Sequence, residues 1–95
     1  MSIILVIDVG TTGLRASLVD ETLAVQALEY RACPPDTPVP GLVEFDGVDL
    51  AAKLLDAALT VLATTSEPVA AVGITNQRAS TLVWDRVTGE PVGPG

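Results

Sequence analysis

Three apolar stretches separated by short polar turns occupy the first third of the chain. Residues 3–7 are all aliphatic and mostly β-branched, which is typical of a strand covered on both faces. Residues 14–19 and 23–31 alternate between apolar and polar side chains, the period-two pattern of a strand. Because the turns between these stretches are short, we expect an antiparallel meander over residues 3–31.

A proline-rich stretch, residues 32–46, separates the meander from a helical pattern. It contains four prolines and Gly41, so we expect an extended loop. Asp46 is typical of a helix N-cap, and Asp49 three residues later takes the second position of a capping box. Polar and apolar side chains then recur at helical spacing, which predicts a helix over residues 47–65.

Two further strands are expected after the helix, at residues 69–75 and 81–85. The first is apolar, and we expect it to be buried and parallel to the first strand after the helical crossover. The element order is then β-β-β-α-β-β, an α/β fold with a mixed sheet. A single helix leaves one face of such a sheet bare, which indicates the N-terminal part of a larger domain in a longer protein.

Composition excludes several classes of function. The 95 residues include 5 Lys and Arg against 12 Asp and Glu, a net charge of −7, which argues against a nucleic-acid binder. Without histidine, and with Cys33 as the only cysteine, the chain has no zinc site, Ser-His-Asp triad or internal disulfide of its own. The first apolar run is too short for a secretory signal or a membrane span, so we expect a cytoplasmic protein.

The segment after the first strand, Asp8-Val9-Gly10-Thr11-Thr12-Gly13-Leu14-Arg15, has groups suited to phosphoryl transfer. A carboxylate at a strand end can hold hydrated Mg²⁺. The two glycines permit unusual dihedral angles and close approach of N–H groups to an anion, while two hydroxyls and a guanidinium add donors. It is not a Walker loop, because no Gly-Lys-Ser/Thr follows. Taken alone, an ordinary hairpin turn explains this octet equally well.

A second polar segment, Gly73-Ile74-Thr75-Asn76-Gln77-Arg78, leaves the strand that follows the helix. We expect it to lie near the same sheet edge as Asp8. Its amides and guanidinium provide donors for a hydroxyl-rich ligand. Taken alone, a polar turn that satisfies its own backbone is the simpler interpretation.

Four blocks occur in order along the chain: Asp8-x-Gly10-Thr11-Thr12-x-x-Arg15, Gly41-Leu42-Val43-Glu44-Phe45-Asp46, Gly73-Ile74-Thr75-Asn76-Gln77-Arg78 and Val83-Trp84-Asp85-Arg86-x-Thr88-Gly89-Glu90-Pro91. Through them the chain resembles the N-terminal segment of the FGGY carbohydrate kinases, and most of all the glycerol kinase branch. The resemblance covers essentially all 95 residues. It implies an actin-like, ribonuclease H-like fold, with ATP and Mg²⁺ in a cleft between two domains. The γ-phosphoryl of ATP would pass to a hydroxyl of a polyol or sugar.

The resemblance also implies a role for each matching residue. Asp8 would help to hold Mg²⁺, Arg78 would bind substrate hydroxyls, and Gln77 would support it. The ATP phosphates would be contacted by Gly10, Thr11, Thr12 and Arg15. The catalytic base and the adenine pocket would come from sequence after Gly95, so we expect the 95-residue piece alone to be inactive.

Two positions depart from the glycerol kinase pattern. Ala79 stands where those kinases have a Glu that grips the polyol, which leaves glycerol itself in question as the substrate. Leu42 stands where the family has an aromatic residue. The expected partners are a small polyol or sugar and the remainder of the kinase chain, with no nucleic acid and no membrane. A homo-oligomer of the full-length form stays open.

Two other interpretations stay open beside the kinase. An actin-like ATPase of chaperone or cytoskeletal type also uses an Asp-x-Gly-Thr-Thr loop, although Thr75-Asn76-Gln77-Arg78 is better suited to a small hydroxylated ligand. A stand-alone binding or structural module is disfavoured by the bare sheet face, and a non-catalytic fragment stays open as an alternative.

Four residues outside the two polar segments have simple structural interpretations. We interpret Cys33 as an incidental thiol, because no base is near it in sequence. Trp84 is expected to pack in a core or interface. Glu44 is expected to fix the proline-rich loop, and Asp85 to be a turn residue.

Overall fold

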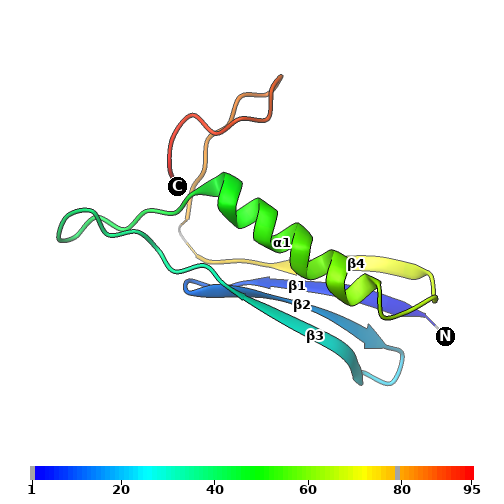
Figure 1. Ribbon diagram of the computed structural model, residues 1–95. Helices are drawn as coiled ribbons and strands as arrows, with labels where there is room; N and C mark the ends of the chain where they lie inside the picture. The colour runs from blue at the N-terminus through cyan, green and yellow to red at the C-terminus, as the bar shows by residue number, and fades with distance from the viewer. Residues whose placement is uncertain (1, 79) are drawn as a thin grey trace.

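The computed structural model describes residues 2–78 and 80–95, which form one mixed sheet with a helix against it (Figure 1). The elements are β1 (Ile3–Val9), β2 (Gly13–Asp20), β3 (Val25–Ala32), α1 (Gly47–Leu62) and β4 (Val69–Thr75). The sheet order is β3-β2-β1-β4. The pairs β1–β2 and β2–β3 are antiparallel, and β4 is parallel to β1. The predicted meander, helix and parallel strand are confirmed.

The core lies between α1 and one face of the sheet. Alternate residues of the two central strands are buried under the helix: Ile3, Leu5, Ile7, Val9, Leu14, Ala16 and Leu18. The helix contributes Ala57, Ala58 and Val61 to this core. On the opposite face of β1, Ile4 is 41% exposed, so β1 is covered on one face only and the bare sheet face is present.

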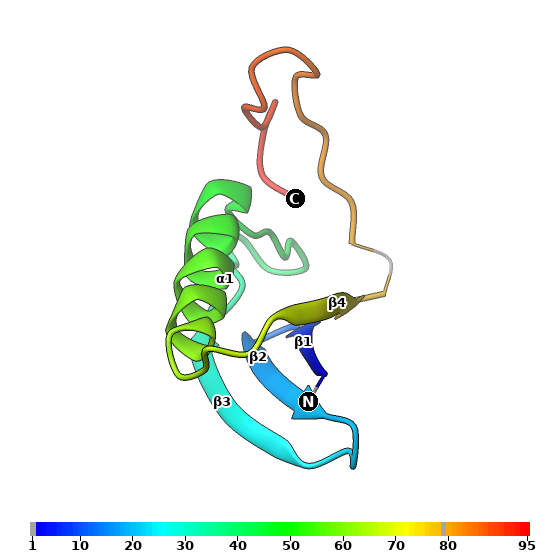
Figure 2. The same cartoon turned by 90° about the vertical axis from the view of Figure 1, so that its right-hand side faces the viewer.

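The strand β4 is largely exposed, which corrects the prediction of a second buried strand. Register pairs Val72 with Leu5 and Ile74 with Ile7, so both β4 side chains are on the face that α1 covers elsewhere. They are nevertheless 56% and 68% exposed. The reason is the position of α1, which packs mainly over β2 and β3 and leaves the β4 edge uncovered (Figure 2).

Within the described residues, the start of α1 has the predicted N-cap but lacks the second hydrogen bond of the predicted capping box. The Asp46 carboxylate accepts from the N–H groups of Val48 at 2.9 Å and Asp49 at 3.1 Å, which confirms the N-cap. The Asp49 carboxylate turns to Lys53 at 3.0 Å, and no reciprocal capping-box bond forms within the described ranges. The helix ends at Leu62, three residues earlier than predicted. The chain continues as a tighter turn, in which the Thr64 and Thr65 N–H groups donate to carbonyls three residues earlier.

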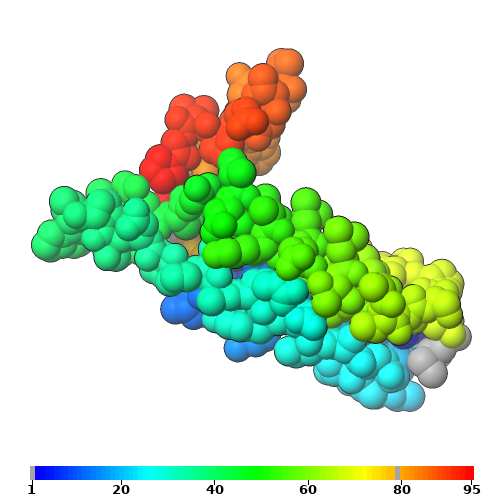
Figure 3. Space-filling view, in the orientation of Figure 1, coloured from blue at the N-terminus to red at the C-terminus, as the bar shows by residue number. Residues whose placement is uncertain are grey.

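The predicted strand at residues 81–85 is wrong. This part of the chain forms an isolated bridge between Trp84 and Pro91 and projects away from the sheet (Figure 3). An apolar run needs a neighbouring strand to form a ladder, and the described part of the chain places none beside residues 81–85. Trp84 is consequently 60% exposed in this chain rather than packed in a core.

Asp85 is the turn residue that the sequence indicates. Its carboxylate accepts from the N–H groups of Thr88 at 2.9 Å and Val87 at 2.8 Å. These backbone hydrogen bonds, first that from Thr88, lower the pKa of Asp85. Glu44 helps to close the proline-rich loop through its backbone, which forms a two-bond bridge with Asp36. Across the described residues, no helix has the length and apolar character needed to span a membrane.

Candidate functional site

The turn between β1 and β2 contains three of the predicted phosphate-binding residues, Gly10, Thr11 and Thr12, and the fourth, Arg15, lies in β2. The turn is closed by a hydrogen bond from the Gly10 N–H to the Gly13 carbonyl, 2.8 Å long. The Gly10 N–H is therefore used inside the turn rather than offered to an anion. Thr11 and Thr12 are exposed, and their N–H groups have no hydrogen-bond partner in the described part of the chain. These two residues are the free donors of the turn.

The glycines of this turn leave room for close neighbours. Neither has a positive φ, which corrects the expectation of unusual dihedral angles. A Cβ at Gly10 would lie 3.1 Å from the Gly13 carbonyl oxygen, a tight contact against backbone. A Cβ at Gly13 would lie 2.3 Å from the Tyr30 hydroxyl oxygen. Sequence alone gave no sign of Tyr30, because its place over the turn depends on the β2–β3 register.

Asp8 and Arg15 lie side by side at the start of this turn, on the sheet face opposite α1. They are a cross-strand pair, and on the other side of Asp8 the register places Thr75 of β4. Among the residues that the structure describes, no ion pair joins Asp8 to Arg15. The Arg15 guanidinium instead lies 5.2 Å from the centroid of the Tyr30 ring. The half-buried Asp8 carboxylate and the exposed Arg15 guanidinium, both among the described residues, are therefore neighbours that form no ion pair with each other.

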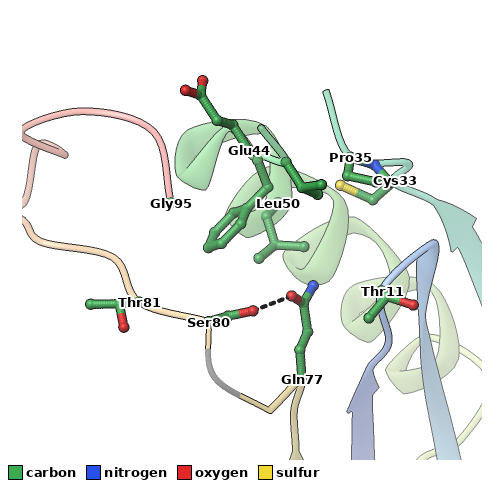
Figure 4. Close-up of a pocket in the computed structure, with 11 residues that line it drawn as sticks. Thr11, Cys33, Pro35, Glu44, Leu50, Gln77, Ser80, Thr81 and Gly95 are labelled. Atoms are coloured by element: carbon green, nitrogen blue, oxygen red, sulfur yellow. Dashed lines mark hydrogen bonds between the residues drawn. The ribbon is translucent and has the colours of Figure 1, made fainter. Parts of the chain in front are cut away.

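The parallel pairing of β1 and β4 brings the second polar segment to the same sheet edge, as predicted. The Gln77 side chain donates from Nε2 to the Gly10 carbonyl at 3.0 Å. Its Oε1 accepts from the Ser80 hydroxyl, a contact drawn in Figure 4. Both ends of the Gln77 amide are therefore occupied by protein groups. Gln77 connects the two segments, and this uses one of the two N–H donors of its Nε2.

A pocket of about 290 Å³ opens between this connection and the start of α1 (Figure 4). Thr11, Gln77 and Ser80 are among its polar lining, and Cys33, Phe45 and Leu50 are among its apolar lining. Arg78 does not line it and is exposed. Ala79, the position that departs from the glycerol kinase pattern, lies outside the described residues.

Cys33 has the character of a structural thiol. The side chain is buried, and its Sγ lies 3.8 Å from Asp49 Oδ2. Burial is the main cause that raises the pKa of this thiol, so the reactive thiolate is disfavoured. This agrees with the interpretation of Cys33 as an incidental thiol.

The cations divide into paired and unpaired ones. Arg31 binds Glu29 and Asp56, each at 2.8 Å, and Lys53 binds Asp49. Arg15, Arg78 and Arg86 have no carboxylate partner in the described ranges. The two arginines that the sequence analysis singled out are therefore available to an anionic or hydroxylated ligand.

Comparison with known proteins identifies the family. Residues 3–95 match the model of the N-terminal domain of the FGGY family of carbohydrate kinases. The chain belongs to this family. It is 44% identical over 90 residues to the glycerol kinase of Gloeobacter violaceus, covering 95% of this chain and 18% of that protein. It is 43% identical over 89 residues to the glycerol kinase of Haloferax volcanii, covering 90% of this chain and 18% of that one.

Solved structures agree with this assignment. The glycerol kinase of Plasmodium falciparum with ADP superimposes with a TM-score of 0.89 at 30% identity, over 99% of this chain and 20% of that chain. A ligand-bound xylulose kinase from Lactobacillus acidophilus has the same TM-score at 19% identity, over 99% of this chain and 19% of that chain, which shows a shared fold. The FGGY chain described here thus spans about a fifth of the length of these relatives.

Proposed function

We propose that this chain forms the phosphate-binding side and one wall of the substrate site of an ATP-dependent carbohydrate or polyol kinase. The observation that carries the proposal is the hydrogen bond from Gln77 to the Gly10 carbonyl, 3.0 Å long. This bond holds the turn after β1, whose N–H groups and hydroxyls would bind phosphate, against the segment after β4, whose Arg78 would bind substrate hydroxyls. A kinase needs this proximity, because the transferred phosphoryl group and the acceptor hydroxyl must be held together.

On the phosphate side, the free N–H groups and hydroxyls of Thr11 and Thr12, with Arg15, would hold the ATP phosphates. Gly10 shapes the turn and offers its carbonyl to Gln77. Asp8 suits Mg²⁺, since it is a carboxylate with no protein cation bound to it in the described ranges, and Mg²⁺ prefers oxygen ligands. When bound, Mg²⁺ would neutralise part of the negative charge of the ATP phosphates.

On the substrate side, Arg78 would donate to hydroxyl groups of a polyol or sugar, while Gln77 keeps the Arg78 segment in place. The acceptor oxygen would form a bond to the γ-phosphorus as the bond from that phosphorus to the ADP oxygen breaks. The proton of the acceptor hydroxyl would pass to a base outside these 95 residues. The similarity to glycerol kinases favours a small polyol, and the Ala79 position leaves the choice between glycerol and a larger acceptor to experiment.

The test uses a kinase of family length that contains these residues. We expect ADP formation that depends on Mg²⁺ and on one member of a panel of polyols and sugars. Asp8→Asn should lower kcat about 100-fold or more, the effect of losing a charge-stabilising group. Asp85→Asn is the matched control, because it makes the same change at a turn carboxylate with no proposed part in binding or catalysis, and it should leave kcat near wild type. ADP formation that no acceptor stimulates would contradict the proposal and favour an actin-like ATPase.

We also propose that the protein acts in the cytoplasm, where its expected co-substrate ATP is made available. Its partners would then be a small polyol or sugar and the remainder of the kinase chain. Size-exclusion chromatography of the full-length protein would decide whether it forms a homo-oligomer.

A further inference from the structure

Arg15, Tyr30 and Gly13 form a cluster on the sheet face opposite α1. The β2–β3 pairing sets Arg15 directly opposite Tyr30, and Arg15 Cζ lies 5.2 Å from the ring centroid, within cation–π distance. The same ring covers Gly13, where a Cβ would lie 2.3 Å from Tyr30 Oη and 2.5 Å from Tyr30 Cζ. The ring can take this position because residue 13 is a glycine.

The contact determines how the Arg15 guanidinium is used. Asp8 lies opposite Arg15 on the other side, and an ion pair between them would neutralise both groups. No such pair is found among the described residues, and the guanidinium lies over the Tyr30 ring instead. An aromatic face accepts no conventional hydrogen bond, so the planar N–H edge of Arg15 stays available to an anion. Asp8 stays available to a cation because Arg15 forms no ion pair with it in the described part of the chain.

We propose that Tyr30 is a positioning residue for phosphate binding, which holds the Arg15 guanidinium over its ring and apart from Asp8, and that Gly13 is the position that admits the ring. This inference rests on the proposed function, in which Arg15 contacts ATP phosphates. The ring carries the role rather than the hydroxyl, because the Tyr30 Oη contact to the Thr12 carbonyl is long, at 3.5 Å. Tyr30 is 44% exposed, so it contributes little to core packing.

The first test compares Tyr30→Phe with Tyr30→Ile in a kinase of family length. Both replacements are apolar and suited to a strand, but only Phe keeps an aromatic face. We expect Tyr30→Ile to raise KM for MgATP about two- to fivefold, the factor that an exposed cation–π contact is worth. Tyr30→Phe should keep a KM close to wild type. The KM for the acceptor and the affinity for adenosine, which lacks phosphates, should stay unchanged in both variants.

The second test uses Gly13 to move the ring without replacing it. Gly13→Ala should displace Tyr30 and raise KM for MgATP as much as Tyr30→Ile does. The double variant Gly13→Ala/Tyr30→Ile should show no further rise, because the space that the ring filled is then free. Additive effects of the two changes would overturn the proposed relation between Gly13 and Tyr30.

Three outcomes distinguish this inference from the proposed function. Equal KM values for the Phe and Ile variants would overturn the inference while the kinase activity stands. A loss that extends equally to adenosine or to the acceptor would show general structural damage and overturn it as well. A wild-type enzyme with no MgATP-dependent activity would overturn the proposed function itself, before any variant is compared.

Discussion

Gln77 and Gly10, 67 residues apart in the chain, are joined by a hydrogen bond from the side-chain amide of Gln77 to the backbone carbonyl of Gly10. The bond connects the segment after β4 to the turn after β1, at the edge where both strands end. The Gln77 side-chain oxygen accepts from the Ser80 hydroxyl, so the two hydrogen bonds of this amide hold the two segments together. We therefore propose a supporting role for Gln77.

Replacement of Gln77 tests this assignment. Gln77→Leu removes both hydrogen bonds at similar side-chain size, and we expect kcat/KM for MgATP to fall about tenfold, since an unpaired polar group costs about 1–3 kcal/mol. Gln77→Glu keeps an acceptor for the Ser80 hydroxyl but no donor for Gly10, and should resemble the Leu variant. Steady-state kinetics with both substrates varied provide the measurement. A change confined to the KM of the acceptor would instead identify Gln77 as a substrate ligand.

The N-cap of α1 gives a prediction about stability. Asp46→Ala removes two hydrogen bonds to the first turn and should lower the free energy of unfolding by about 1 kcal/mol. Asp49→Ala, which removes the surface pair with Lys53 and the long contact with the Cys33 thiol, should cost about 0.5 kcal/mol or less. Urea denaturation followed by circular dichroism measures both. Equal losses for the two variants would show that the cap does not determine where the helix begins.

Asp20 gives a prediction about acid sensitivity. Its carboxylate accepts from the hydroxyl and N–H of Thr22, the Ala24 N–H and the Gln26 amide. The side-chain hydrogen bond from Thr22 is the largest cause that lowers the pKa of Asp20 below its usual value of 3.8. A carboxylate whose pKa is lowered by folding stabilises the native state above the unfolded-state pKa, and this stabilisation is lost as the pH falls through the folded-state pKa.

Asp20→Asn should therefore destabilise the protein at neutral pH and matter less as the pH is lowered. The measurement is the difference in thermal midpoint between wild type and variant, taken at several values from about pH 6 to about pH 3. The advantage of wild type should begin to shrink as the pH falls past the usual value of 3.8 toward the lower folded-state pKa. A difference that stays constant across the range would show that the charge of Asp20 plays no part.

Cys33 gives a prediction about reactivity. Its buried thiol with a raised pKa should react with a disulfide reagent at neutral pH far more slowly than the thiol of the urea-unfolded chain, which serves as the reference. Cys33→Ala should leave the kinetic constants near wild type. Rapid labelling of the folded protein, accompanied by loss of activity, would assign Cys33 a functional place in the pocket that it lines.

The parts of this structure that depend on local pattern could be predicted from sequence. The apolar run of the first strand, the alternation of the next two, the Asp46 cap and the polar segments after β1 and β4 each follow from neighbouring residues. Features that depend on distant partners could not. The contact of Tyr30 with Gly13 requires the β2–β3 register, and the apolar run at residues 81–85 had the composition of a strand but no neighbouring strand.

The exposed strand β4 has a consequence for synthesis on the ribosome. Among the described residues no strand pairs with its outer edge, so the backbone groups there form a template onto which another extended chain can add. In a kinase of the relatives' length, this edge emerges when about a fifth of the chain has been made. At about 5–20 residues per second, the remaining four fifths take many seconds more. During that interval a nascent chain of this sequence is at its most prone to aggregate.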